Sequence, residues 1–277
     1  MSKQQYFYLI SGLPDLAITD THLPFATKAF LDELKNKIDQ KDFELVCWLY
    51  YSKDNINLIN ILFNENPSNQ QEGYYLLQEL KRGVEGNTVL PYYISDFNAS
   101  FTENKNLFTK AGWEAKLTEN YFREAMKSGN EFLNRWMEFE LNLKNLLLIM
   151  SNKKEQIPFS EFIIEANEMA ALFKQNPSAD FSTESSLGFL TQVIKIIETD
   201  NIIEREKKID LLRWKQLEEM TFFNYFTVEA ILGFIIKLMI LERWAILKQE
   251  QEQEKISLPS ILNSFMEKIE MPEFKHA

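Results

Sequence analysis

The sequence contains few of the residues that metal centres and hydrolytic active sites need. Its 277 residues include one cysteine, Cys47, and two histidines, His22 and His276. Zinc and di-iron sites require several His, Cys or carboxylate ligands clustered at set spacings, and a single cysteine with two widely separated histidines offers few such ligands. A Ser-His-Asp triad would depend on one of two histidines near opposite ends of the chain, and neither lies in a recognisable nucleophile motif. We therefore expect no metal, no cofactor and no enzymatic activity.

Glycine and proline are also scarce, at eight residues each, whereas aromatic residues are abundant and include 22 phenylalanines. This composition is typical of a globular chain with a large apolar core. All eight prolines can be placed between predicted helices or at helix starts, and helical periodicity runs through most of the chain. The sequence thus predicts an all-α fold. Residues 6–10 favour a strand by propensity, and the first turn of a buried helix is the alternative.

Positive charge is in deficit, because 30 lysines and arginines face 41 aspartates and glutamates, for a net charge of −11. Nucleic-acid-binding proteins usually carry a clustered basic face, and the sequence has no basic cluster, so we expect no nucleic-acid partner. The first residues lack the basic and apolar regions of a secretion signal, which makes the cytoplasm the expected compartment. A lone Cys47 in an apolar run is expected to be a buried structural thiol.

The most apolar stretch of the chain covers residues 222–247. Its core, Ala230–Leu241, is shorter than the roughly 20 residues that a bilayer-spanning helix needs. A helix that is apolar on nearly every side is normally buried among other helices. Glu242 borders this core, and a buried carboxylate needs partners. We therefore expect Glu242 to be largely buried, to be held by Arg243, another basic group or backbone amides, and to join two helical domains.

Two earlier stretches are similar to the end of this helix. In each of the three, a polar residue stands three positions before a small residue that is followed by an apolar pair. The small residues are Asn57, Asn145 and Ala245, which are 88 and 100 residues apart. An internal repeat would divide the chain into three helical parts. Those parts are residues 1–90, 91–175 and 176–277. Chance resemblance between apolar helices is the alternative.

The residues Tyr6–Leu16 (YFYLISGLPDL) resemble the start of an uncharacterised bacterial family whose genes accompany V/A-type ATPases. The three stretches are similar to the repeat of the C/d-type central-stalk family of those ATPases. That repeat has an acidic residue, then Asn and an apolar pair, on the second long helix of each of three related domains. The matching positions are Asp54 with Asn57, Glu140 or Asn142 with Asn145, and Glu242 with Arg243. Trp244 and Ala245 stand where the family has Arg and Asn.

The resemblance implies a funnel of three helical domains in a pseudo-threefold arrangement. Such a protein passes torque between the central-shaft subunits and the membrane rotor ring without catalysis. It is cytoplasmic, and it is peripheral to the inner membrane through its complex, without inserting into the bilayer. A helical adaptor that binds proteins in a groove is the alternative, although it would show a repeat of about 34 to 47 residues. An enzyme is the third possibility, and it would need a pocket with a perturbed carboxylate such as Glu242.

Overall fold

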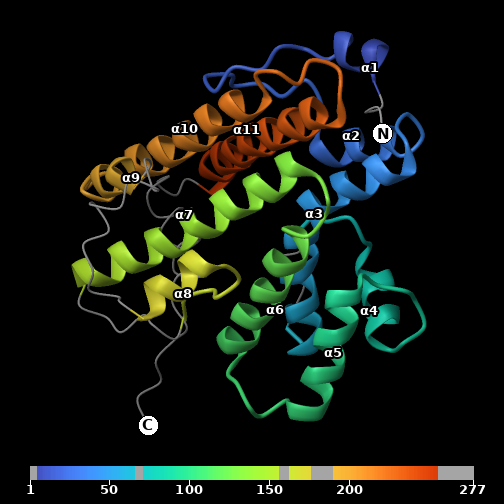
Figure 1. Ribbon diagram of the computed structural model, residues 1–277, viewed down its shortest axis with the longest axis vertical. Coiled ribbons are helices and arrows are strands. Elements are labelled where there is room, and N and C mark those ends of the chain that lie inside the picture. Colours follow the sequence, from blue (N-terminus) through green and yellow to red (C-terminus); the bar gives the residue numbers. More distant parts are fainter. Residues whose placement is uncertain (1–4, 66–70, 156–161, 176–189, 255–277) are drawn as a thin grey trace. The chain divides into compact units, whose positions relative to one another are not determined.

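The computed structural model of the protein describes residues 5–65, 71–155, 162–175 and 190–254 (Figure 1). Within these ranges it is all-α, with eleven helices and no strand. The helices are α1 (Phe7–Ser11), α2 (Thr27–Leu34), α3 (Gln40–Leu62), α4 (Leu77–Val84), α5 (Tyr92–Asn104), α6 (Lys110–Ala125), α7 (Glu131–Glu155), α8 (Glu168–Gln175), α9 (Leu190–Ile197), α10 (Ile202–Thr221) and α11 (Val228–Glu254). The segment with strand propensity therefore forms a helix, although no residue of α1 is buried.

Polar caps and one glycine set several of the helix boundaries. The side chain of Asn201 accepts a backbone N–H at the start of α10, and Thr109 does the same for α6. Between α6 and α7, Gly129 has a φ of +79°, in the left-handed region that favours glycine. Asn130 then caps α7. The sequence shows a helical pattern over residues 116–150 and predicts a kink or break at Gly129, and in the structure α6 ends at Ala125 and α7 begins at Glu131.

The chain forms two compact units, residues 1–43 with 180–277 and residues 44–179. Residues 1–90, expected as one part, are divided between these two units. The three-part division by repeats stays a prediction, because a compact unit and a repeat need not coincide.

In the first unit, α11 packs against both α10 and α2, and α9 packs against α10 (Figure 1). The apolar core of α11 is buried, with Ile231, Leu232 and Leu238 fully shielded from solvent. Gly233 permits close packing, because a Cβ at this position would lie 2.7 Å from the Thr221 methyl carbon. The helix expected from residue 222 begins only at Val228, since residues 222–227 form the turn between α10 and α11. Beyond the apolar stretch, the polar residues that follow Leu247 continue α11 to Glu254.

In the second unit, α4, α5, α6, α7 and α8 pack in chain order, each against the next. Its interior is rich in aromatic rings. Trp113 lies edge-to-face with Phe97 and Phe101, at centroid distances of 5.5 and 5.1 Å. The hydroxyl of buried Tyr93 donates to the Asn55 side chain over 2.9 Å, so its polar atom is satisfied.

One boundary in this unit differs from the sequence prediction. A helix is expected over residues 159–173, but α8 begins only at Glu168. Residues 163–167 are not helical, because the backbone of Ile164 is hydrogen-bonded to the side chain of Asn145. Residues 156–161 lie outside the described residues, as does the helix expected over 259–269.

Among the described residues, no helix combines the length and the apolar character that crossing a membrane requires.

Candidate functional site

Three long helices, α3, α7 and α11, each use polar side chains to hold the segment that leads into a short helix. We call these contacts junctions. Each junction lies within one compact unit. The residues that make them come from the three similar stretches of the sequence.

The first junction joins α3 to the segment before α4. The side-chain amide of Asn57 donates to the Gln71 carbonyl over 2.8 Å, and the Gln71 N–H donates back to Asn57 Oδ1 over 2.9 Å. One turn earlier, Asp54 is fully buried and its carboxylate accepts the N–H groups of Tyr74 and Tyr75, at 3.0 and 3.1 Å. Main-chain amides therefore help to satisfy the buried charge.

A glycine makes this close approach possible. A Cβ on Gly73 would lie 2.0 Å from Asp54 Oδ1, well inside van der Waals contact. Any larger residue would push the segment away from α3 and lengthen the hydrogen bonds to Asp54. The glycine, the aspartate and the asparagine therefore act as one structural unit.

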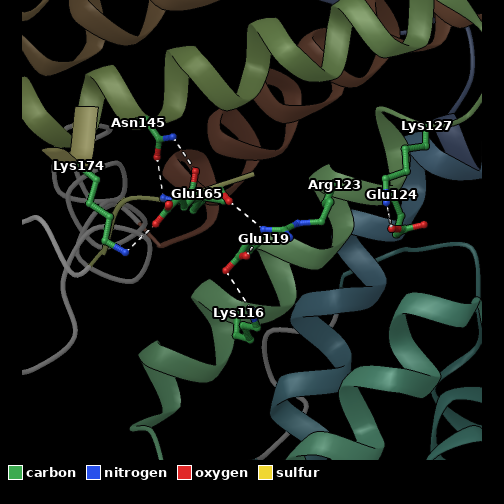
Figure 2. A network of polar contacts seen from close by, with 9 residues as sticks. Lys116, Glu119, Arg123, Glu124, Lys127, Asn145, Glu165 and Lys174 are labelled. Carbon is green, nitrogen blue, oxygen red and sulfur yellow. Dashed lines mark hydrogen bonds and ion pairs between the residues drawn. The ribbon is translucent and has the colours of Figure 1, made fainter. Parts of the chain in front are cut away.

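The second junction joins α7 to the segment before α8 and repeats the amide pair. Asn145 Nδ2 donates to the Ile164 carbonyl over 3.0 Å, and the Ile164 N–H donates to Asn145 Oδ1 over 3.0 Å (Figure 2). Asn145 is fully buried. Three residues before it, Asn142 accepts a hydrogen bond from the Asn167 side chain over 3.0 Å. Asn167 also caps α8 by accepting the Ala170 N–H.

The two junctions share their register on both sides. The holding residues are three apart, at 54 and 57 and at 142 and 145, which is almost one helical turn. The held residues are also three apart, at 71 and 74 and at 164 and 167. Asn142, and not Glu140, is thus the counterpart of Asp54. Glu140 is half-buried. The pKa of Tyr121 is raised mainly by the burial of Tyr121 itself and further by the nearby charge of Glu140.

Exposed ion pairs surround the second junction, as Figure 2 shows. Arg123 on α6 donates to the Glu165 carbonyl over 3.0 Å and also pairs with Glu119. Lys174 on α8 pairs with the Glu165 carboxylate over 2.7 Å. Exposed pairs of this kind contribute little to stability, so the buried amides provide most of the hold.

The third junction joins α11 to the start of α2. Glu242 accepts the Thr27 N–H over 2.9 Å with one carboxylate oxygen and the Thr27 hydroxyl over 2.5 Å with the other. Thr27 is the first residue of α2 and is fully buried, while Glu242 is half-buried. A carboxylate at a helix N-terminus is favourable because the free N–H groups and the helix dipole both attract it.

The third junction lacks the asparagine pair, and its register gives a reason. Ala245 occupies the position of the asparagines, three residues after Glu242. Three residues before Thr27, where the other junctions place the main-chain donor, the chain has Pro24. A proline has no N–H to donate. An asparagine at position 245 would therefore lack half of the hydrogen bonding that Asn57 and Asn145 have.

Arg243 does not pair with Glu242, contrary to one of the expected arrangements. It binds α10 instead, where its guanidinium contacts Glu206 over 3.0 Å and also pairs with Asp210. Asp210 is buried, and it additionally accepts the Trp244 indole N–H over 2.7 Å and pairs with Arg213 over 3.2 Å. This buried carboxylate fixes α10 to α11. Sequence reasoning missed it, and its one sequence signal is an aspartate within the apolar positions of α10.

The cysteine and a tyrosine near the first junction are held in their neutral forms. Cys47 is buried, as expected, and burial raises the pKa of its thiol to about 12. Burial likewise raises the pKa of Tyr75 to about 12. Neither group is ionised at neutral pH, so neither is activated as a nucleophile or base. Within the described part of the chain, no cluster of three or more His, Cys, Asp or Glu side chains could hold a metal ion.

The arrangement is suited to holding helices in fixed positions. Most of the polar side chains in the junctions bind main-chain groups of the same chain, so their hydrogen bonds are made within the protein.

One family model matches residues 1–266, and its description is "Protein of unknown function (DUF2764)". Neither the curated proteins nor the solved structures include a significant match.

Proposed function

The chain belongs to that family, and we propose that it is a non-catalytic central-stalk subunit of a V/A-type rotary ATPase, which couples the central shaft to the membrane rotor ring. The observation that supports this most is the recurrence of a polar junction on three long helices. Asp54 with Asn57, Asn142 with Asn145, and Glu242 are the positions at which the sequence resembles the repeat of the C/d-type central-stalk family.

The order of the junctions supports a repeat that closes on itself. Helix α3 holds the segment leading into α4, α7 holds the segment leading into α8, and α11 holds the start of α2. Each of the first two long helices binds the next short helix in the chain, and the last long helix binds an early short helix. Three repeats related by a pseudo-threefold axis would produce this cyclic order. We therefore include the pseudo-threefold arrangement and the funnel in the proposal.

The chemistry of the junctions fits a part that transmits torque. A joint under load must not yield under strain, and buried hydrogen bonds are costly to break because their groups would remain without partners. The aromatic interior around Trp113 adds close packing, which makes a body stiff. The peripheral location, at the membrane rotor ring, follows from the proposed partner and from no feature of the chain itself.

The test is to delete the gene in the native host and to measure ATP hydrolysis and ATP-driven ion transport separately. A coupling role predicts that the catalytic head still hydrolyses ATP while ion transport in membrane vesicles is lost. Re-expression of the parent chain should restore transport. The affinity-tagged chain should also co-purify with the shaft subunits in mild detergent.

Normal ion transport in the deletion strain would overturn the proposal. A helical adaptor unrelated to the ATPase is the competing function, and exposed aromatic side chains on the first compact unit favour protein binding in either case. The adaptor predicts unchanged transport and partners outside the ATPase. ATPase subunit genes on both sides of this gene would support the stalk assignment.

A further inference from the structure

Aromatic side chains are exposed on the first compact unit, where α1 lies beside the connection between α10 and α11 (Figure 1). The Tyr6 N–H donates to the Phe226 carbonyl over 2.7 Å, and the rings of Phe7 and Phe226 are 4.6 Å apart. Two segments that are far apart in the sequence are thereby fixed side by side.

Five large aromatic residues on these two segments face solvent. They are Phe7, Tyr8, Phe222, Phe223 and Tyr225, which are 48, 98, 63, 82 and 65% exposed. At about 150 to 250 Å² for each full side chain, they leave on the order of 500 to 900 Å² of aromatic surface in water. Two segments joined at Phe7 and Phe226 thus carry an apolar surface comparable in size to one side of a standard protein interface, which is about 800 Å². We call these five residues the aromatic patch.

Neither helix formation nor core packing accounts for the exposed rings of Phe222 and Phe223. Phe222 and Phe223 pack edge-to-face on each other at 4.8 Å, and they precede α11, which begins at Val228. A connection of this kind is satisfied by polar residues, which cost nothing to expose. Exposed phenylalanines in a turn therefore need another explanation than helix formation or core packing.

The charges on the segments that carry the aromatic patch are mostly acidic. Asp15, Asp20, Glu218 and Glu219 are exposed on residues 5–27 and 216–236, and these two ranges contain no lysine or arginine. Lys215 and Lys237 flank the second range, and Lys237 pairs with Glu218 over 3.5 Å, which leaves the acidic side chains in excess. An apolar surface with an acidic surround complements a partner that presents apolar side chains next to basic ones.

We propose that the aromatic patch is a docking surface for another protein, which presents an amphipathic helix with a basic polar face. Anionic lipid is a poorer fit, because membrane-surface proteins use lysine and arginine where this chain has carboxylates. A second copy of this chain is disfavoured by repulsion between identical acidic surfaces. The inference goes beyond the proposed function and does not depend on it, since it specifies the chemistry of the partner and not its name.

The first experiment is site-specific photo-crosslinking in the native host. Benzoylphenylalanine replaces Phe223 in one strain and Tyr92 in the control strain, because Tyr92 is a comparably exposed aromatic residue, at 79%, in the other unit. We expect a cross-linked product from position 223 alone, with the attached peptide mapping to an apolar segment flanked by lysine or arginine in a different protein. A product containing lipid, this chain itself or an acidic segment would overturn the inference. Equal yields from the two positions, or no product, would overturn it as well.

The second experiment uses the purified partner that the cross-link identifies. Phe223→Ser should raise the Kd at least tenfold, while Tyr92→Ser should change it less than twofold. Glu219→Gln should raise the Kd and weaken its dependence on salt, because it removes one charge from the acidic surround. Unchanged circular dichroism and melting temperature will show that the variants are folded. Equal affinity of the parent and Phe223→Ser would refute the role of the patch.

The outcome for the proposed function is separate. If the cross-linked protein belongs to the stalk or ring of a rotary ATPase, both inferences are supported. If it is a basic amphipathic protein of another system, the docking surface stands and the stalk assignment fails.

Discussion

The paired hydrogen bonds of Asn57 and Asn145 make a quantitative prediction, because one substitution can be made at two sites with the same geometry. Replacing either residue with alanine removes the side chain that donates to one main-chain carbonyl and accepts from one N–H in its junction. A buried group left without a partner costs about 1 to 3 kcal/mol. Ile164 is buried, so Asn145→Ala strands two groups away from water.

We expect Asn145→Ala to lower the free energy of unfolding by about 3 to 5 kcal/mol. Gln71 is half-buried, so water can reach the groups freed by Asn57→Ala, and that change should cost about 2 to 3 kcal/mol. Urea unfolding followed by circular dichroism gives the totals. Hydrogen exchange at the Ile164 amide gives the local effect, where protection should fall at least tenfold in Asn145→Ala.

Two controls accompany this pair. Asn104→Ala removes an exposed asparagine of α5 and should change stability by no more than about 0.5 kcal/mol. Ala245→Asn should give no gain, because Pro24 offers no N–H for the new side chain. If Asn145→Ala unfolds at the urea concentration of the parent and the Ile164 amide stays protected, the reciprocal pair does not hold this junction, and the argument is wrong.

Three further predictions concern the other polar contacts. Glu242→Ala should lower the free energy of unfolding by about 2 to 3 kcal/mol, and its effect should be less than additive with Thr27→Val, because both remove the same hydrogen bonds; strict additivity would contradict that pairing. Gly73→Ala should destabilise the chain by about 1 to 3 kcal/mol through its clash with Asp54, and an unchanged melting temperature would show that the segment can move aside without loss. The Cys47 thiol, with its pKa raised to about 12 by burial, should react with iodoacetamide at pH 8 at least tenfold more slowly in the native protein than in urea; equal rates would mean that solvent reaches it.

The parts of the structure that the sequence predicts are those with a local signal. Helical periodicity and the placement of the prolines predict the all-α class, which the described residues confirm. The three-residue spacing singles out Asp54 with Asn57 and marks Asn145. At the second stretch the spacing favours Asn142, three residues before Asn145, whereas the acidic character of Asp54 favours Glu140, five residues before it, and only the hydrogen bonds of the folded chain decide between them.

The partners of these residues have no signal of that kind. Asn57 and Asn145 bind the backbones of Gln71 and Ile164, and any residue with an N–H and a carbonyl could stand there. Thr27 and Glu242 are 215 residues apart, and no local pattern connects them. These contacts depend on the tertiary fold, so a single sequence does not reveal them.

The two misplaced helix starts have the same physical origin. Residues 159–164 and 222–226 are rich in apolar side chains, and apolar runs of this kind predict the beginnings of helices. In the first, the Ile164 N–H donates to the Asn145 side chain and therefore cannot donate within an α-helical ladder. In the second, the aromatic side chains of residues 222, 223 and 225 remain in water on the aromatic patch.

The hydrogen bonds of the junctions also explain why the residue types vary at one position, with Asp54, Asn142 and Glu242, but follow a stricter rule at the other, with Asn57 and Asn145. Asp54 and Glu242 accept hydrogen bonds from donors at the start of a segment or helix, so a carboxylate or an amide oxygen can serve there, and Asn142 fills the same role. The asparagine must donate and accept at once, which a carboxylate cannot do. By register, Pro24 stands where the third junction would place the partner of that asparagine, and a proline has no N–H to donate. The hydrogen-bonding groups of the held backbone therefore account for the asparagines at positions 57 and 145 and for the alanine at position 245.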